Sequence, residues 1–220
     1  MGARHVFLET NWLVACFAPA HFQMSDASNL FHETKEGRIS LHIPSICLSE
    51  ARSVIRRKFQ PRSQADNFRN YLRWAKQETI VPEEKSRIVR EVLDTYENVL
   101  LRELDRLEER LATLAKEPGV DVFPLTDRTL ERSVQLGTEK LELDPFDNSI
   151  LAAVLTRADE LKSADKSAEI FFCELDSHLQ PWDKVGNRRL PLAQLFDDAH
   201  VWVYGDFSMQ SPDRPADWPI

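Results

Sequence analysis

Short, nearly continuous apolar runs recur along the chain, and longer stretches with apolar residues three or four positions apart separate them. The short runs predict buried strands, and the periodic stretches predict amphipathic helices. The predicted strands lie at residues 5–8, 39–43, 120–123, 170–173 and 201–204. Because strands that alternate with helices favour a parallel sheet, we expect an α/β protein of three layers, α/β/α, with a central, mostly parallel, twisted sheet.

Helices are expected between the strands, and turn residues mark several of their ends. We predict helices at 12–17, about 20–35, 45–59, 126–140 and 144–157. Asp144 stands before Pro145, the arrangement of an N-cap followed by the first helical residue. The tail at 207–220 is rich in Pro and Asp and is expected to be poorly ordered.

Residues 61–118 depart from the alternation of strands and helices. Pro61 and Pro82 can each open a helix, and leucines three or four positions apart continue the second helix until Pro118. We therefore expect a long helical-hairpin arm inserted into a single domain at 1–206. The apolar residues of this arm are expected to pack within it or on a second copy of the chain.

The composition of the 220 residues allows a sizeable core and disfavours several classes of protein. Hydrophobic residues make up 42%, whereas 28 basic and 36 acidic residues give a net charge of −8, which disfavours charge-driven coating of DNA. Cys16, Cys47 and Cys173 are far apart and odd in number. Neither a disulfide framework nor a cysteine zinc site is therefore expected, and a reducing cytoplasm fits best. No apolar run approaches the length of a membrane span.

Four acidic residues lie near the carboxyl ends of the predicted strands. Glu9 comes directly after the first strand, and Glu50 lies early in the helix that follows the second strand. Asp147 opens the helix at 144–157, and Asp176 follows the fourth strand. Ligand sites in open parallel sheets lie beyond these strand ends, so the four carboxylates are expected to converge there. A cation would offset their repulsion, and oxygen ligands without His or Cys suit Mg²⁺ or Mn²⁺.

Each acid also has a purely structural explanation. Asp144 would cap its helix, and Asp147 would then fall in the first turn, where acids favour the helix dipole. Glu50 could be a solvated helix residue, and Asp176 could belong to a turn. Glu9 is the hardest to explain in this way, because an acid next to a buried strand needs a partner. The six histidines show no metal-ligand spacing and are expected to be packing or surface residues.

Four short segments carry these acids in a characteristic order. They are Val6-Phe7-Leu8-Glu9-Thr10-Asn11, Pro44-Ser45-Ile46-Cys47-Leu48-Ser49-Glu50, Asp147-Asn148-Ser149-Ile150-Leu151-Ala152-Ala153 and Ile170-Phe171-Phe172-Cys173-Glu174-Leu175-Asp176. Taken together, this ordered set resembles the PIN-domain family of metal-dependent nucleases. The resemblance covers about residues 4–59 and 120–204 and implies a PIN-like fold with the helical arm as an insertion.

The resemblance implies hydrolysis of phosphodiester bonds in RNA, with DNA left open, assisted by one or two Mg²⁺ or Mn²⁺ ions. The implied catalytic and metal-binding residues are Glu9, Glu50, Asp147 and Asp176. Asn11 would orient Glu9, and Asp144 would be an outer acid. Such an endoribonuclease could be the toxin of a toxin–antitoxin pair, with an antitoxin-like protein as its partner.

Two positions depart from the family pattern. Glu9 stands where the family usually has Asp, and Glu174 stands where it tends to have Thr or Ser. These departures favour an alternative, in which a catalytically inactive PIN-like domain binds RNA or protein. A phosphohydrolase of the haloacid-dehalogenase or receiver type fits less well, because the segment Glu9-Thr10-Asn11 lacks the DxD motif that a haloacid dehalogenase would need.

A basic segment occupies residues 52–76. It holds eight basic residues and one acid, within a chain of net charge −8. This asymmetry predicts a phosphate-binding flank, although a solvated helix face explains the same pattern. The predicted nucleic-acid-binding residues are Arg52, Arg56, Arg57, Lys58 and Arg62. Trp12, Tyr71 and Trp74 could stack on bases, but we expect them to pack in the interior.

Overall fold

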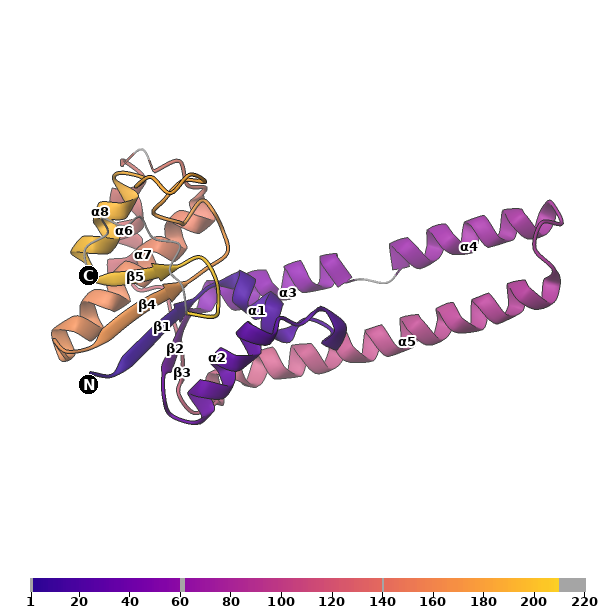
Figure 1. Ribbon diagram of the computed structural model, residues 1–220, viewed down its shortest axis with the longest axis horizontal. Helices are drawn as coiled ribbons and strands as arrows, with labels where there is room; N and C mark the ends of the chain where they lie inside the picture. The colour runs from indigo at the N-terminus through magenta and orange to yellow at the C-terminus, as the bar shows by residue number, and fades with distance from the viewer. Residues whose placement is uncertain (1, 60–61, 140, 210–220) are drawn as a thin grey trace.

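Five parallel strands form a single sheet in the computed structural model, which describes residues 2–59, 62–139 and 141–209 (Figure 1). The strands are β1 (Arg4–Leu8), β2 (Ser40–Pro44), β3 (Val120–Phe123), β4 (Glu169–Cys173) and β5 (Val201–Tyr204). Their order across the sheet is β3-β2-β1-β4-β5, and every neighbouring pair runs in the same direction. The predicted α/β class and the five strands are therefore confirmed.

Helices connect the strands and make up the arm. The helices within the described ranges are α1 (Thr10–Phe17), α2 (Ser25–Lys35), α3 (Ser45–Phe59), α4 (Arg62–Gln77), α5 (Glu83–Thr113), α6 (Asp127–Leu136), α7 (Pro145–Ala164) and α8 (Leu192–Asp198). Short 3₁₀ turns occur at Ala20–Phe22 and Leu114–Lys116. No helix in this part of the chain combines the length and the apolar character needed to cross a bilayer.

Some predicted helical segments differ from the structure, and one helix was not predicted. The helix expected at 144–157 continues to Ala164 as α7. The helix expected at 20–35 is a 3₁₀ turn and then α2, because Gln23 and Met24 are extended between them. The helix expected at 126–140 ends at Leu136 within the described residues, since its polar C-terminal turn has little to bury. Helix α8 was not predicted, because it is only seven residues long.

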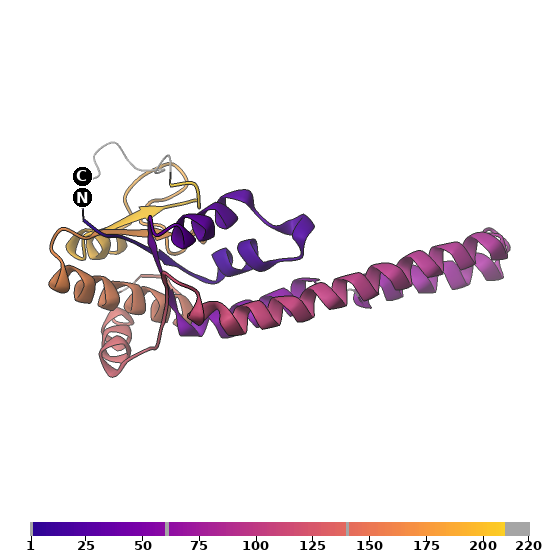
Figure 2. The same ribbon diagram turned by 90° about the horizontal axis from the view of Figure 1, so that it is seen from below.

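The two faces of the sheet are covered by different sets of helices (Figures 1 and 2). Phe7, Phe123 and Phe172 point to the face that α7 and α8 cover: the ring of Phe172 lies 6.1 Å from that of Phe196 in α8. Side chains alternate along a strand, so the neighbouring residues Val6 and Leu8 point to the opposite face, where α1, α2, α3 and the inner end of α5 pack. The result is the expected three-layer arrangement.

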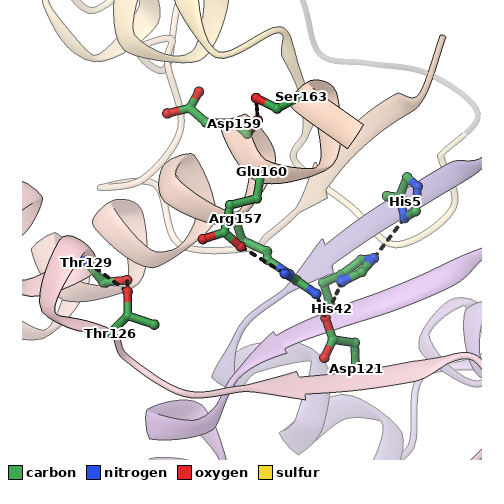
Figure 3. A network of polar contacts seen from close by, with 9 residues as sticks. All are labelled: His5, His42, Asp121, Thr126, Thr129, Arg157, Asp159, Glu160 and Ser163. Carbon is green, nitrogen blue, oxygen red and sulfur yellow. Dashed lines mark hydrogen bonds and ion pairs between the residues drawn. The ribbon is translucent and has the colours of Figure 1, made fainter. Parts of the chain in front are cut away.

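A polar network ties α7 to the strands on the first of these faces (Figure 3). His42 of β2 is only 4% exposed. Its Nδ1–H donates a hydrogen bond of 2.9 Å to Asp121 Oδ2, and its Nε2 shares a hydrogen bond of 2.9 Å with His5 Nδ1. Arg157 of α7 donates to the same Asp121 carboxylate at 2.8 Å and to Glu160 at 2.8 Å. These partners satisfy a histidine that would otherwise be a buried polar group, which agrees with the packing role predicted for it.

The arm consists of α4 and the outer part of α5, which run antiparallel and reach away from the sheet (Figures 1 and 2). The inner part of α5 belongs to the body, because Leu104, Leu107 and Leu111 are buried in the main core, as is Leu114 of the 3₁₀ turn that follows. The insertion predicted at 61–118 therefore contributes both a projecting hairpin and one wall of the domain.

The outer boundaries of the predicted domain and tail also change. Phe207 is 2% exposed and Met209 packs against the core, so these two residues of the predicted tail belong to the folded body. The rest of that tail, 210–220, lies outside the described residues.

Candidate metal centre

The order of the strands singles out one point on the carboxyl edge of the sheet. From β1 the chain proceeds to β2 and β3 on one side, and later to β4 and β5 on the other. The strand order thus reverses between β1 and β4, the position at which open α/β sheets hold their ligands. Leu8 pairs with Cys173 in the last register of these two strands, so the next residues, Glu9 and Glu174, lie beside each other at this point.

Glu9 is almost completely buried, with 3% of its surface exposed. It is the N-cap of α1, and its Oε2 accepts a hydrogen bond of 2.7 Å from the backbone N–H of Asn11. Its Oε1 is buried and has no hydrogen-bond partner among the described residues. Burial, followed by the negative charges of Glu50 and Asp176, raises the pKa of Glu9 to about 8, although Asn11 opposes this shift.

Glu174 is fully buried, and neither of its carboxylate oxygens has a hydrogen-bond partner in the described part of the chain. Burial raises its pKa well above the usual range, and the charges of Glu9, Asp176 and Asp147 add to the effect. The nearby backbone N–H of Asp176 lowers the pKa of Glu174 in opposition to these effects, but it does not form a hydrogen bond with either carboxylate oxygen. Glu174 was not among the predicted site residues and stood out only as a departure from the family pattern. Its position one residue beyond a buried strand, like that of Glu9, was the signal in the sequence.

Glu50 approaches the same point from α3. The hydroxyl of Thr10, the first residue of α1, donates a short hydrogen bond to Glu50 Oε2 and so joins the beginning of α1 to α3. The charge of Glu50 helps to raise the pKa of both Glu9 and Asp147. Glu50 is therefore part of the same electrostatic cluster and not an isolated solvated residue.

Asp147, Asp176 and His178 form the outer side of the cluster. One ligand atom from each lies within 4.8 Å of the other two. Asp176 Oδ1 accepts a hydrogen bond of 2.8 Å from the backbone N–H of His178 and lies 3.1 Å from its Nδ1. Burial, followed by the charges of Asp144 and Asp176, raises the pKa of Asp147 to about 6.

His178 was not among the predicted site residues, because the spacing of the histidines along the chain does not reveal it. It is exposed, as a surface histidine would be, but it stands next to two carboxylates. Its only sequence signal is that it lies two residues from Asp176.

The two supporting residues lie where the sequence placed them. Asp144 is the N-cap of α7, and its Oδ1 accepts hydrogen bonds of 2.8 and 2.9 Å from the backbone N–H groups of Phe146 and Asp147. Asn11 contacts Glu9 through its backbone N–H, and its side chain also lowers the pKa of that carboxyl. Each therefore positions an acid of the cluster.

Five carboxylates thus gather with little compensating charge. They are Glu9, Glu50, Asp147, Glu174 and Asp176. Within the described ranges, the imidazole of His178 is the one basic side chain within ion-pair distance of any of them, 3.1 Å from Asp176 Oδ1. Carboxylate oxygens that lack protein partners are ligands for hard divalent cations, and Mg²⁺ and Mn²⁺ are the ions that such a set suits. The donor set therefore fits the ion that the sequence predicts.

The predicted basic flank is partly neutralised by the arm. Arg52 and Arg56 both form ion pairs with Glu108 of α5. Arg57 and Lys58 are exposed and have no ion pair with any other described residue. The side chain of Arg62 lies outside the described residues.

Two further cations of the basic segment are compensated in a similar way, whereas Arg73 donates a hydrogen bond of 3.2 Å to the neutral amide oxygen of Asn70. On α4, Arg69 pairs with Asp94 and Glu97, and Lys76 pairs with Glu83. The surplus of positive charge counted along the sequence is therefore much smaller in the folded chain, because α5 supplies acids opposite α3 and α4.

The aromatic residues considered for base stacking divide into two groups. Trp12 is fully buried, and its Nε1–H donates a hydrogen bond of 3.0 Å to the backbone oxygen of Ala27. Tyr71 and Trp74 are 53% and 49% exposed, so the prediction that they pack in the interior was wrong. They lie on the arm, whose narrow hairpin has room for only one face of each helix.

Comparisons of the chain with protein-family models, with curated proteins and with solved structures found no match.

Proposed function

We propose that the protein is a nuclease of the PIN-like type that depends on Mg²⁺ or Mn²⁺ and hydrolyses phosphodiester bonds, with RNA as its substrate. One observation carries this proposal: two buried glutamates with unpartnered oxygens lie at the switch point of the sheet, facing three further carboxylates. Burying such groups is unfavourable unless something compensates them, and a divalent cation does so directly.

Four of the acids would hold the ion, and neighbouring groups fix the orientation of two of them. Glu9, Asp147, Glu50 and Asp176 would be its ligands. The backbone N–H of Asn11 fixes one oxygen of Glu9 and leaves the other free, and the Thr10 hydroxyl fixes one oxygen of Glu50. When bound, such an ion polarises a water molecule and stabilises charge on the scissile phosphate and the leaving oxygen.

The protein itself needs no nucleophilic side chain in this chemistry. Cys47 and Cys173, the thiols nearest the acids, are buried, and burial raises the pKa of both, so neither is an activated thiolate. His178 is exposed beside Asp147 and Asp176, where it can exchange protons with solvent and with the departing oxygen of the substrate. Arg57 and Lys58, on the helix that carries Glu50, are the cations that remain available to phosphates.

A second candidate function is the metal-free binding module. The observation in its favour is that the pKa of Glu9, raised to about 8, leaves this residue largely protonated at neutral pH without an ion. A neutral Glu9 beside a neutral Glu174 needs no cation, so the fold would persist as a scaffold for binding RNA or protein.

Thermal unfolding of the full chain with and without Mn²⁺ separates the two candidates. For the nuclease, saturating Mn²⁺ is expected to stabilise the protein by about 2–3 kcal/mol at a hundredfold excess over the dissociation constant. Asp147→Asn should abolish this gain, whereas Asp105→Asn, a matched change at an exposed position of α5, should preserve it.

The activity itself is tested by incubating the protein with RNA and DNA oligonucleotides in Mg²⁺ or Mn²⁺. We expect cleavage of RNA that EDTA and Asp147→Asn abolish. A wild-type protein that neither binds Mn²⁺ nor cleaves either nucleic acid would leave the binding module as the better account.

A further inference from the structure

The outer part of the arm exposes an unusual number of large apolar side chains. Between 41% and 61% of the surface of each is accessible. They are Phe68, Tyr71 and Trp74 on α4, and Ile88, Val92, Tyr96 and Val99 on α5. The aromatic rings of α4 form a continuous row, with centroids 6.2 Å apart between Phe68 and Tyr71 and 5.8 Å apart between Tyr71 and Trp74. We call these seven residues the apolar flank.

The register of the two helices brings the seven residues together. Arg69 pairs with Asp94 and Glu97, and Lys76 pairs with Glu83, so α4 and α5 are antiparallel with Tyr71 level with Val92. On both helices the flank residues follow one another at three- and four-residue steps, which forms a row along one side of a helix.

Both rows lie on the same side of the hairpin. The contact faces are marked by the buried residues Ala65 and Leu72 on α4, and Ser86 and Leu100 on α5. On each helix, the centre of the apolar row lies about a quarter of a turn, or somewhat more, around the helix axis from the centre of the contact face. The row is displaced in the same helical sense on both helices. Because the helices are antiparallel, equal rotations lead to the same side. Trp74 and Ile88 form the rims of this surface.

The hairpin cannot cover this surface itself. Its interior at the outer end is thin, since Ala75 and Ser86 occupy buried positions there. Aromatic side chains present roughly 150–250 Å² each, so seven large side chains about half exposed amount to on the order of 600 Å². A patch of this size is at the upper end of the roughly 300–600 Å² found for the largest apolar patch of a typical monomer, and it approaches the ~800 Å² that each partner contributes to a stable interface.

We propose that the apolar flank is covered by the same flank of a second copy of this chain, with the two arms antiparallel. Lys85 lies toward the tip end of the flank and Glu103 toward its base, and neither forms an ion pair with another described residue. Antiparallel stacking places each lysine opposite the glutamate of the other copy. It also keeps the bodies of the two chains, each chain of net charge −8, at opposite ends of the assembly. This inference is independent of the metal centre.

The oligomeric state in solution tests the proposal. Sedimentation equilibrium of the full chain should give twice the monomer mass at micromolar concentration. Val92→Glu and Tyr71→Glu, each in the middle of the flank, should give monomers with unchanged circular dichroism. Asn98→Glu, an exposed position of α5 on another side of the helix, should remain dimeric. A monomeric wild-type protein, or a dimer that survives both flank substitutions, overturns the proposal.

Cross-linking tests the direction of the arms. A mixture of Lys85→Cys and Glu103→Cys proteins should form a disulfide-linked dimer under mild oxidation, since the three native cysteines are buried. Efficient linkage of Lys85→Cys to itself would instead place the two tips together and contradict the antiparallel arrangement.

Discussion

Glu9 and Glu174 are the first residues beyond the paired ends of β1 and β4, and both carboxyl groups are buried. The two residues are far apart in the sequence, but they are neighbours in the structure because β1 and β4 are paired in parallel. Burial raises the pKa of both groups, and the charge of Glu9 further raises the pKa of Glu174, so a full charge on both at neutral pH is unfavourable without a compensating cation. Binding of the proposed ion at this pair should therefore release protons.

The affinity for Mn²⁺ should increase steeply with pH. The pKa is raised to about 8 for Glu9 and to about 6 for Asp147, so protons compete with the ion below these values. We expect calorimetric titrations to show weak binding at pH 5.5 and binding that strengthens from pH 6 to pH 8. In Glu9→Gln the increase in affinity at the higher pH values of this range should disappear. A wild-type affinity that does not change with pH would contradict the assignment of Glu9 and Asp147 as ligands.

Stability without metal should change in the opposite sense. A folded-state pKa above the ordinary value of 4.5 means that the folded chain binds the proton of Glu9 more tightly than the unfolded chain does. The free energy of unfolding should therefore decrease as pH rises from about 4.5 through 8, by an amount on the order of a few kcal/mol. Urea unfolding in EDTA across this range measures the effect, and Glu9→Gln should show a smaller slope.

Substituting Glu174 should have opposite effects on two quantities: the stability of the metal-free protein and the stabilisation that Mn²⁺ provides. Glu174→Gln removes a buried charge or proton-sharing group, so we expect the metal-free protein to gain roughly 1–3 kcal/mol at pH 8. The stabilisation by Mn²⁺ should decrease in the same variant. Glu169→Gln, at the exposed start of the same strand, serves as the control and should change neither quantity appreciably. An unaltered response to Mn²⁺ in Glu174→Gln would remove this residue from the centre.

The basic flank predicts different behaviour for two adjacent arginines. Arg57→Glu should weaken RNA binding and reduce the slope of log affinity against log salt by about 1, because Arg57 is exposed and free to contact phosphate. Arg56→Glu also breaks an ion pair with Glu108, so it should lower stability by up to about 1 kcal/mol in addition. Fluorescence anisotropy at several salt concentrations measures both. Equal salt slopes in the wild type and in Arg57→Glu would exclude this flank as a phosphate site.

The polar network on β2 and β3 should make the stability of the fold decrease at acid pH. His42 first, and then Arg157, lower the pKa of Asp121 to about 2. The resulting stability is complete above the ordinary value of 3.8 and is lost as pH falls toward 2. Asp121→Asn should therefore destabilise the protein at pH 7 by roughly 1–2 kcal/mol, since Asp121 is partly exposed. The difference from the wild type should vanish near pH 2 in denaturant titrations.

The sheet could be predicted from the sequence because each strand is buried and therefore carries a compact apolar run. The 45–59 helix and the 120–123 strand were predicted with the boundaries that the structure has. Helix α8 and the break at Gln23 were missed, since both depend on tertiary packing and not on local periodicity.

Some residues of the candidate site could likewise be selected from the sequence, whereas others required the structure. Position after a strand was sufficient to select Glu9 and Asp176, whereas Glu174 and His178 needed the register between β1 and β4 and the path of the following loop. The charge of the basic segment was overestimated for the same reason. Acids such as Glu108 are distant in sequence, and only the packing of α5 against α3 reveals that they neutralise the arginines.

Helix α5 runs without interruption over 31 residues, from the arm into the core of the body. At 1.5 Å per residue it is a rod of about 45 Å. Because a hinge where the arm meets the body would have to break backbone hydrogen bonds of this helix, the arm cannot swing freely. Force applied at its far end is instead transmitted through Leu107 and Leu111 to the buried neighbours of α1, the helix that starts directly after Glu9.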